Sequence, residues 1–130
     1  MNDSDGQLPH PAIRVAAMPS DANPSGDIFG GWILGQMDIA GGIIAALKAK
    51  GRVVTVGVEA MSFHLPVFIG DLVSCYGDVE RIGRTSISIR VETWVRRREG
   101  GERVKVTEGV FTYVALDSRR KPRLIKADDD

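Results

Sequence analysis

The chain has 130 residues, 43% of them hydrophobic and 26% charged, and its 17 basic and 17 acidic residues leave no net charge at pH 7. These values predict one globular domain with a sizeable core and argue against nucleic acid as a partner. The single cysteine, Cys75, excludes an internal disulfide, and the two histidines, His10 and His64, lack the spacing of a metal motif. We therefore expect neither a metal nor a redox cofactor.

The chain begins with a polar segment, residues 1–11, that lacks the apolar stretch of a signal peptide. We expect this segment to be disordered and the protein to be cytoplasmic. Residues 13–18 (IRVAAM) predict a short strand that ends at Pro19, and residues 19–27 (PSDANPSGD) are dense in turn formers and predict a loop. A single domain is expected over residues 12–125, followed by a short disordered tail, residues 126–130.

Residues 28–50 predict a helix with apolar residues on every side, so it needs cover all round. About twenty mostly apolar residues can cross a membrane, but polar residues at the middle and the strand pattern that follows favour a soluble domain without a membrane partner. The pair Gly41 and Gly42 lowers helix propensity and favours close approach of another backbone, such as a partner helix. Gly51 is expected to end the helix in the left-handed conformation.

From Arg52 the hydrophobic pattern has a period of two and predicts four long strands, with turns at residues 83–84 and 99–102. Short connections produce antiparallel pairing, so we expect an α+β fold whose sheet curls round the helix. In the last strand, residues 103–116, Phe111 and Tyr113 alternate with valines and are placed on the second face. One sheet covers one side of the helix only. The uncovered side and these aromatic rings predict an obligate homodimer. Beyond the last strand, the polar tail is expected to fray.

One acidic side chain interrupts the apolar helix. Asp38 is costly to bury unless it is paired, neutralised or used in chemistry, and a satisfied structural acid is the plain alternative. Gly30 and Gly31 fall where the helix begins, so their N–H groups have no intrahelical acceptor and can meet a negative ligand atom. Backbone donors and a lone carboxylate on one helix make a candidate active site.

Three segments carry a resemblance to a known family: residues 18–38 (MPSDANPSGDIFGGWILGQMD), 51–63 (GRVVTVGVEAMSF) and 83–95 (GRTSISIRVETWV). They resemble the hotdog-fold acyl-CoA thioesterases of the YciA type, which are related to the brain acyl-CoA hydrolases. The resemblance covers nearly the whole chain. It implies an antiparallel five-stranded sheet wrapped around one long central helix, a hexamer built as a trimer of dimers, and hydrolysis of acyl-CoA. It also implies that Asn23 and Asp38 are catalytic.

Thioester hydrolysis needs a base or nucleophile and donors for the developing oxyanion. Asp38 can supply the first, and the Gly30 or Gly31 N–H groups the second. Gly30 and Asp38 are eight residues apart, which is about 12 Å along a helix, so one carbonyl group cannot reach both on the same helix. We therefore expect a site shared across a dimer interface. Activation of water by Asp38 is favoured over direct attack, which stays open, and Asn23 has the alternative of a turn former.

Coenzyme A brings phosphate groups, for which Arg84, Thr85 and Ser86 at a strand turn are the first candidates. The basic runs at residues 96–98 and 119–121 are expected to be solvated loop charge. Glu59 is interpreted as a structural or interface acid, His64 as a strand-end residue without a catalytic role, and Cys75 as an inert small side chain.

Two other functions remain as alternatives. The first is a non-catalytic acyl-CoA-binding module that keeps the fold and tolerates loss of Asp38. The second is a hotdog dehydratase, which ranks last because such an enzyme needs a histidine near the start of the helix, and neither His10 nor His64 lies there.

Overall fold

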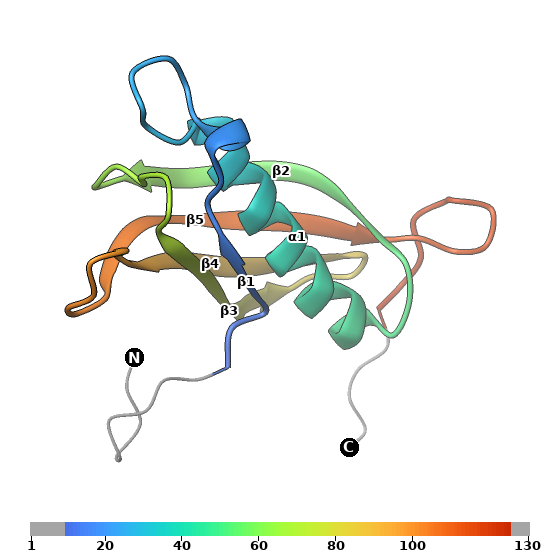
Figure 1. Ribbon diagram of the computed structural model, residues 1–130. Coiled ribbons are helices and arrows are strands. Elements are labelled where there is room, and N and C mark those ends of the chain that lie inside the picture. Colours follow the sequence, from blue (N-terminus) through green and yellow to red (C-terminus); the bar gives the residue numbers. More distant parts are fainter. Residues whose placement is uncertain (1–9, 126–130) are drawn as a thin grey trace.

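The computed structural model describes residues 10–125; residues 1–9 and 126–130, where disorder was expected, lie outside the described range. The elements follow the predicted order: β1 (Ile13–Ala16), a 3-10 turn (Pro19–Asp21), α1 (Gly30–Ala49), β2 (Val53–Phe63), β3 (Leu72–Ile82), β4 (Ser86–Arg96) and β5 (Val104–Ala115). All strand pairs are antiparallel, in the order β1-β3-β4-β5-β2. The sheet curls around α1 (Figure 1), as predicted.

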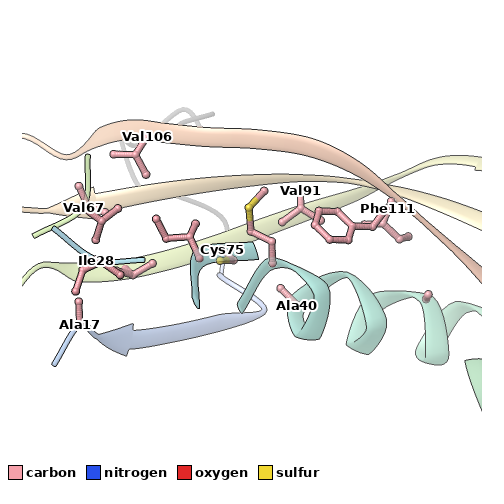
Figure 2. Packing of buried hydrophobic residues seen from close by; sticks show 14 of the residues in the cluster. Ala17, Ile28, Ala40, Val67, Cys75, Val91, Val106 and Phe111 are labelled. Atoms are coloured by element: carbon pink, nitrogen blue, oxygen red, sulfur yellow. The ribbon is translucent and has the colours of Figure 1, made fainter. Parts of the chain in front are cut away.

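One side of α1 packs against the sheet through small and apolar residues that recur every three or four positions. The buried residues of the helix are Ile33, Met37, Ala40, Gly41, Ala45 and Ala49. Figure 2 shows Ala40 on the side of the helix that faces Val91 and Phe111 of the sheet. By length and composition α1 is long and apolar enough to cross a bilayer. In the structure its buried stripe forms the centre of the protein core instead.

The C-terminal end of α1 differs from the prediction. Lys50, with φ 59° and ψ 44°, takes the left-handed conformation that was expected of Gly51. Gly51 instead leaves room for Arg123, because a Cβ at this position would lie 2.7 Å from its Nη2. That nitrogen donates a hydrogen bond of 2.7 Å to the carbonyl oxygen of Ala49. A side chain from the end of the chain therefore caps α1.

The prediction that the polar tail frays is wrong for residues 118–125. This segment turns back, and Arg123 N donates to Ala115 O while Ile125 N donates to Arg84 O. These backbone hydrogen bonds fix the segment beside the end of β5 and the β3–β4 turn, and so hold the Arg123 cap in place.

From Thr107 onward, the faces of β5 are also reversed relative to the prediction, whereas Val104 and Val106 face the core as expected. The register between β4 and β5 shifts by one residue between Thr93 and Trp94, so Val106 is an extra residue in β5. One extra residue turns the following side chains to the other face. Phe111 and Tyr113 are consequently 0% and 1% exposed and belong to the core under α1. These rings therefore give no support for a partner subunit.

The uncovered apolar surface lies instead on α1 and β2. It consists of Ile39, Ile43 and Leu47 on the outer side of α1 and Val54, Val56 and Val58 on the edge strand β2. Leu47 is 75% exposed. A long apolar edge strand is a template for pairing with another chain. We call these six residues the α1–β2 surface.

A buried ion pair fixes the loop between β2 and β3. Asp71 is 2% exposed, and Arg97 donates through Nη1 to its Oδ2 and, at 3.0 Å, to Pro66 O. The Arg97 guanidinium also lies 4.8 Å from the centroid of the Phe68 ring, and Phe68 N donates to Asp71 Oδ2 at 2.8 Å. Arg97 is therefore not the solvated loop charge that was expected.

Candidate active site

Asp38 lies two turns into α1, between β2 and β5. Its Oδ1 accepts hydrogen bonds from Thr55 Oγ1 at 2.7 Å and from the Tyr113 hydroxyl at 3.2 Å. The Tyr113 hydroxyl also donates to the Asp38 backbone oxygen at 2.8 Å. Within residues 10–125, Oδ2 has no hydrogen-bond donor and the carboxylate has no ion pair. Asp38 is thus held by one oxygen and keeps the other available as an acceptor.

The Tyr113 hydroxyl is held in the protonated form that donates a hydrogen bond to this carboxylate. Burial, and then the negative charge and hydrogen bond of Asp38, raise the pKa of Tyr113 far above its usual range, so the hydroxyl stays protonated. A Cβ at Gly41 would overlap the Tyr113 hydroxyl oxygen and lie 3.1 Å from Cζ. The glycine therefore faces an aromatic side chain of its own chain, and not the backbone of a partner helix that the sequence suggested.

Neither donor to Asp38 was predicted from the sequence. Thr55 reads as an ordinary polar residue in the alternating strand β2, and Tyr113 was placed on the wrong face of β5. The glycine pair in mid-helix was the available signal, because it showed that something bulky approaches α1 beside Asp38.

Gly41→Ala should lower activity by displacing Tyr113 from Asp38. We expect kcat to fall about tenfold, since losing one hydrogen bond of about 1–1.5 kcal/mol corresponds to that factor. Thiol release from acyl-CoA, the reaction that the family resemblance implies, measures the effect. Gly42→Ala is the matched control, because its Cβ would lie 3.6 Å from the Tyr113 ring, an ordinary contact. Equal loss in both variants would refute the role given to Tyr113.

Asn23 organises the loop before α1. Its Oδ1 accepts hydrogen bonds from Ser25 N at 2.9 Å and Asp27 N at 3.1 Å, and its backbone N donates to Asp27 O at 2.7 Å. These contacts are those of a turn former, the alternative left open above. The Asn23 side-chain NH2 group makes no hydrogen bond to any residue that the structure describes. It is free for a second role as a donor.

A cleft of about 410 Å³ opens at the N-terminal end of α1. It is lined by the loop before α1, the first turn of α1, the end of β2 and the loop after it: Asn23, Asp27, Ile28, Gly30, Ile33, Phe63, His64, Leu65, Pro66 and Val67. Gly30 and Gly31 head the helix, where backbone N–H groups lack intrahelical acceptors. The cleft therefore combines an apolar wall with backbone and amide donors.

The predicted catalytic residues form two separate groups on one chain. Asn23 and Gly30 line the cleft at the Phe63 end of β2, and Phe63 lies against Gly30. Asp38 is hydrogen-bonded to Thr55, which lies near the opposite end of β2, and Asp38 does not line the cleft. A single chain thus separates the carboxylate from the backbone donors.

The turn predicted to bind CoA phosphates lies at the Asp38 end of the sheet. Ser86 on β4 pairs with Val114 on β5, and Val114 pairs with Val54 on β2. Arg84 is exposed, and its side chain makes no hydrogen bond or ion pair within residues 10–125. Thr85 and Ser86 are half-buried.

The remaining residues singled out in the sequence lie in different parts of the fold. Glu59 is exposed on the edge strand β2. His64 lines the cleft, with Nε2 3.9 Å from Glu108 Oε2. Cys75 is buried, and burial raises the pKa of its thiol to about 11, which keeps the thiol unreactive. Within the described part of the chain, no cluster of His, Cys, Asp and Glu has the arrangement of a metal site.

Comparison with known proteins gives the family. Residues 25–102 match the family model of the thioesterase superfamily. The acyl-CoA thioester hydrolase YciA of Escherichia coli K12 is 50% identical over 119 residues, which cover 89% of this chain and 90% of the relative. The hexameric thioesterase y2039 of Yersinia pestis is 49% identical with a TM-score of 0.88, covering 93% of this chain and 100% of that structure. Cj0915 of Campylobacter jejuni, a hexameric hotdog-fold thioesterase, is 44% identical with a TM-score of 0.86 and 91% coverage of each chain. This chain therefore belongs to the thioesterase superfamily and has its hotdog fold.

Proposed function

We propose that this protein is an acyl-CoA thioester hydrolase that assembles as a homo-oligomer and builds each active site from two chains. The similarity to an acyl-CoA thioester hydrolase and to hexameric thioesterases supports the activity and the assembly. The observation that carries the shared site is the separation of Asp38 from Asn23 and Gly30 on one chain.

The edge strand β2 offers a way to unite the two groups. In a two-fold dimer in which β2 of one chain pairs antiparallel with β2 of its partner, the Thr55 end of each strand lies beside the Phe63 end of the other. Asp38 of one chain then faces the cleft of the second chain, twice per dimer. The same pairing covers the α1–β2 surface, which supports the dimer as the minimal unit. A trimer of such dimers gives the hexamer.

The chemistry follows from this placement. Asp38 takes a proton from water as the water oxygen attacks the thioester carbonyl carbon. The Gly30 and Gly31 N–H groups stabilise the negative oxygen that forms. The intermediate then expels the CoA thiolate, which takes up the proton held by Asp38, so that a fatty acid is left and the base is regenerated. Asn23 positions the reacting carbonyl or water through its side-chain NH2 group, while Thr55 holds Oδ1 of the base.

Coenzyme A enters only as part of the substrate and leaves as product. We place its phosphate groups at the β3–β4 turn, where Arg84 supplies a cation and Thr85 and Ser86 supply hydroxyl groups. The turn lies at the Asp38 end of the sheet, so it would flank the shared site in the paired dimer.

Thiol release tests the proposed activity. The full chain is incubated with acyl-CoAs from short to long chains, and free CoA is followed with a disulfide reagent. We expect turnover, with a chain-length profile set by the depth of the cleft. If every acyl-CoA binds without thiol release, the protein is a non-catalytic binding module and the proposal is wrong.

Complementation between two inactive variants tests the shared site. Asp38→Ala and Asn23→Ala chains are unfolded together, refolded and assayed. Random pairing makes half of the dimers mixed, each with one intact site, so we expect about a quarter of wild-type activity. Each variant treated in the same way alone is the control and should stay inactive. No recovery in the mixture would mean that each site is built from one chain.

A further inference from the structure

The sheet face that points away from α1 carries a small pocket of about 50 Å³. A row of paired residues crosses this face: Arg14 on β1 pairs with Ser74 on β3, and Ser74 pairs with Trp94 on β4. Side chains alternate along a strand, so these three lie opposite the core residues Val73 and Cys75. The other lining residues are Leu72, Tyr76, Val95, Arg96 and Arg103.

Arg103 covers this row of side chains. Its guanidinium carbon lies 4.1 Å from the centroid of the Trp94 ring and 5.5 Å from that of the Tyr76 ring. Stacking on aromatic rings fixes the guanidinium plane and leaves its N–H edges free to donate. Nη1 of Arg103 is buried and has no hydrogen-bond partner. Burying a hydrogen-bond donor without an acceptor costs free energy. A bound molecule that supplies an acceptor to this nitrogen would remove that cost.

The charges around the pocket are unbalanced. Three arginines line it and no acid does. Arg14 Nε donates to the Ser74 hydroxyl at 3.0 Å, and Arg96 Nη1 donates to Gly101 O at 2.7 Å, so both meet neutral acceptors. None of the three makes an ion pair with a carboxylate within residues 10–125.

Glu92, which pairs with Tyr76 on this face, is already engaged. Glu92 accepts a hydrogen bond from Trp94 Nε1 at 3.0 Å and lies 3.8 Å from Lys105 Nζ. It acts on Arg103 electrostatically but makes no ion pair with any of the three arginines within residues 10–125, so the pocket keeps an excess of positive charge.

We infer that this pocket is a binding site for a small oxyanion, a phosphate or carboxylate group, held by Arg14, Arg96 and Arg103. Guanidinium groups form paired, charge-assisted hydrogen bonds with such anions. The pocket lies on the sheet face opposite α1, so it is distinct from the cleft and from Asp38. A bound oxyanion would supply the missing acceptor for Arg103 Nη1 and tie β1, β3 and β4 to the segment before β5.

Thermal unfolding in inorganic phosphate, compared with chloride at equal ionic strength, tests the site. We expect phosphate to raise the Tm of the wild type in a saturable way, by about 3 °C or more. Arg103→Gln and Arg14→Gln should each weaken the apparent affinity at least tenfold; Arg14 is exposed, so its variant remains informative if Arg103→Gln fails to fold. The control is Arg119→Gln, which removes an exposed charge whose side chain makes no hydrogen bond or ion pair within residues 10–125, and it should behave as wild type. A phosphate effect that is absent, or equal in all four proteins, would overturn the inference.

Two further measurements identify the source of the oxyanion. Acetate in place of phosphate shows whether a carboxylate fills the pocket, and an acetate effect with the same dependence on Arg103 would support the site with that ligand. Light scattering reports the assembly. If Arg14→Gln and Arg103→Gln dissociate the oligomer, the arginines hold a carboxylate of another chain and the small-ligand site is overturned. Thiol release should be unchanged in both variants, which separates this result from the proposed hydrolase activity.

Discussion

Asp38→Asn is expected to reduce kcat/KM for acyl-CoA hydrolysis by at least about a hundredfold and to leave the fold intact. A positioned general base contributes about 10²–10⁴-fold, and asparagine can neither accept the proton nor attack the carbonyl. Its amide oxygen can still accept hydrogen bonds from Thr55 and Tyr113, which hold Oδ1 of the aspartate. Thiol release measures the loss, and thermal unfolding shows that the structure survives.

Asp78→Asn is the matched control for this prediction, because it removes an exposed carboxylate from β3 that makes no side-chain hydrogen bond within residues 10–125. It should retain wild-type activity. If Asp38→Asn is equally active, Asp38 is a structural acid satisfied by Thr55 and Tyr113, and the proposed mechanism fails.

The sequence predicts the architecture because the decisive signals are local. Isoleucines and valines alternate along β4, with Ile87, Ile89 and Val91 fully buried on one face. The switch from a helical period to a period of two after Gly51 separates α1 from the strands, and short turns then force antiparallel neighbours. Each of these features can be read within about ten residues of the chain.

The errors come from contacts between distant segments. The bulge at Val106 inverts β5 without any change of composition. Arg97 reads as loop charge because its partner, Asp71, is 26 positions earlier and is itself buried. Lys50, and not Gly51, takes the left-handed conformation, and Gly51 leaves room for Arg123 from a later segment of the chain. In each case tertiary packing overrides a local rule.

The residues of the candidate site also differ in whether the sequence reveals them. Asp38, Asn23 and the Gly30–Gly31 pair stand out because each is unusual where it lies: an acid in an apolar helix, an asparagine in a turn-rich loop, and two glycines at a helix start. Thr55 is ordinary in its strand, and its role becomes visible only through the 2.7 Å hydrogen bond to Asp38. Residues proposed to act on the substrate can therefore be recognised in the sequence because they are unusual for their position. Residues that orient them, such as Thr55, cannot.

The buried pair beside the cleft gives the largest expected effect on stability. Arg97→Met should lower the free energy of unfolding by about 3–5 kcal/mol, because removing one partner of a buried pair leaves an uncompensated charge. Asp71 is 2% exposed and would lose the guanidinium, while Pro66 O would lose its donor. Denaturant unfolding measures the change, and because Pro66 lines the cleft we also expect weaker substrate binding.

Two variants show whether the loss comes from the charge. Arg98→Met removes the neighbouring exposed arginine and should cost less than about 1 kcal/mol, as is usual for surface substitutions. Adding Asp71→Asn to Arg97→Met removes the stranded negative charge and should restore part of the lost stability, because a neutral amide is much cheaper to bury than a carboxylate. A loss in Arg97→Met no larger than that in Arg98→Met would contradict the assignment. It would mean that apolar contacts hold the loop from His64 to Asp71, and that water solvates the Asp71 carboxylate once the Arg97 guanidinium is removed.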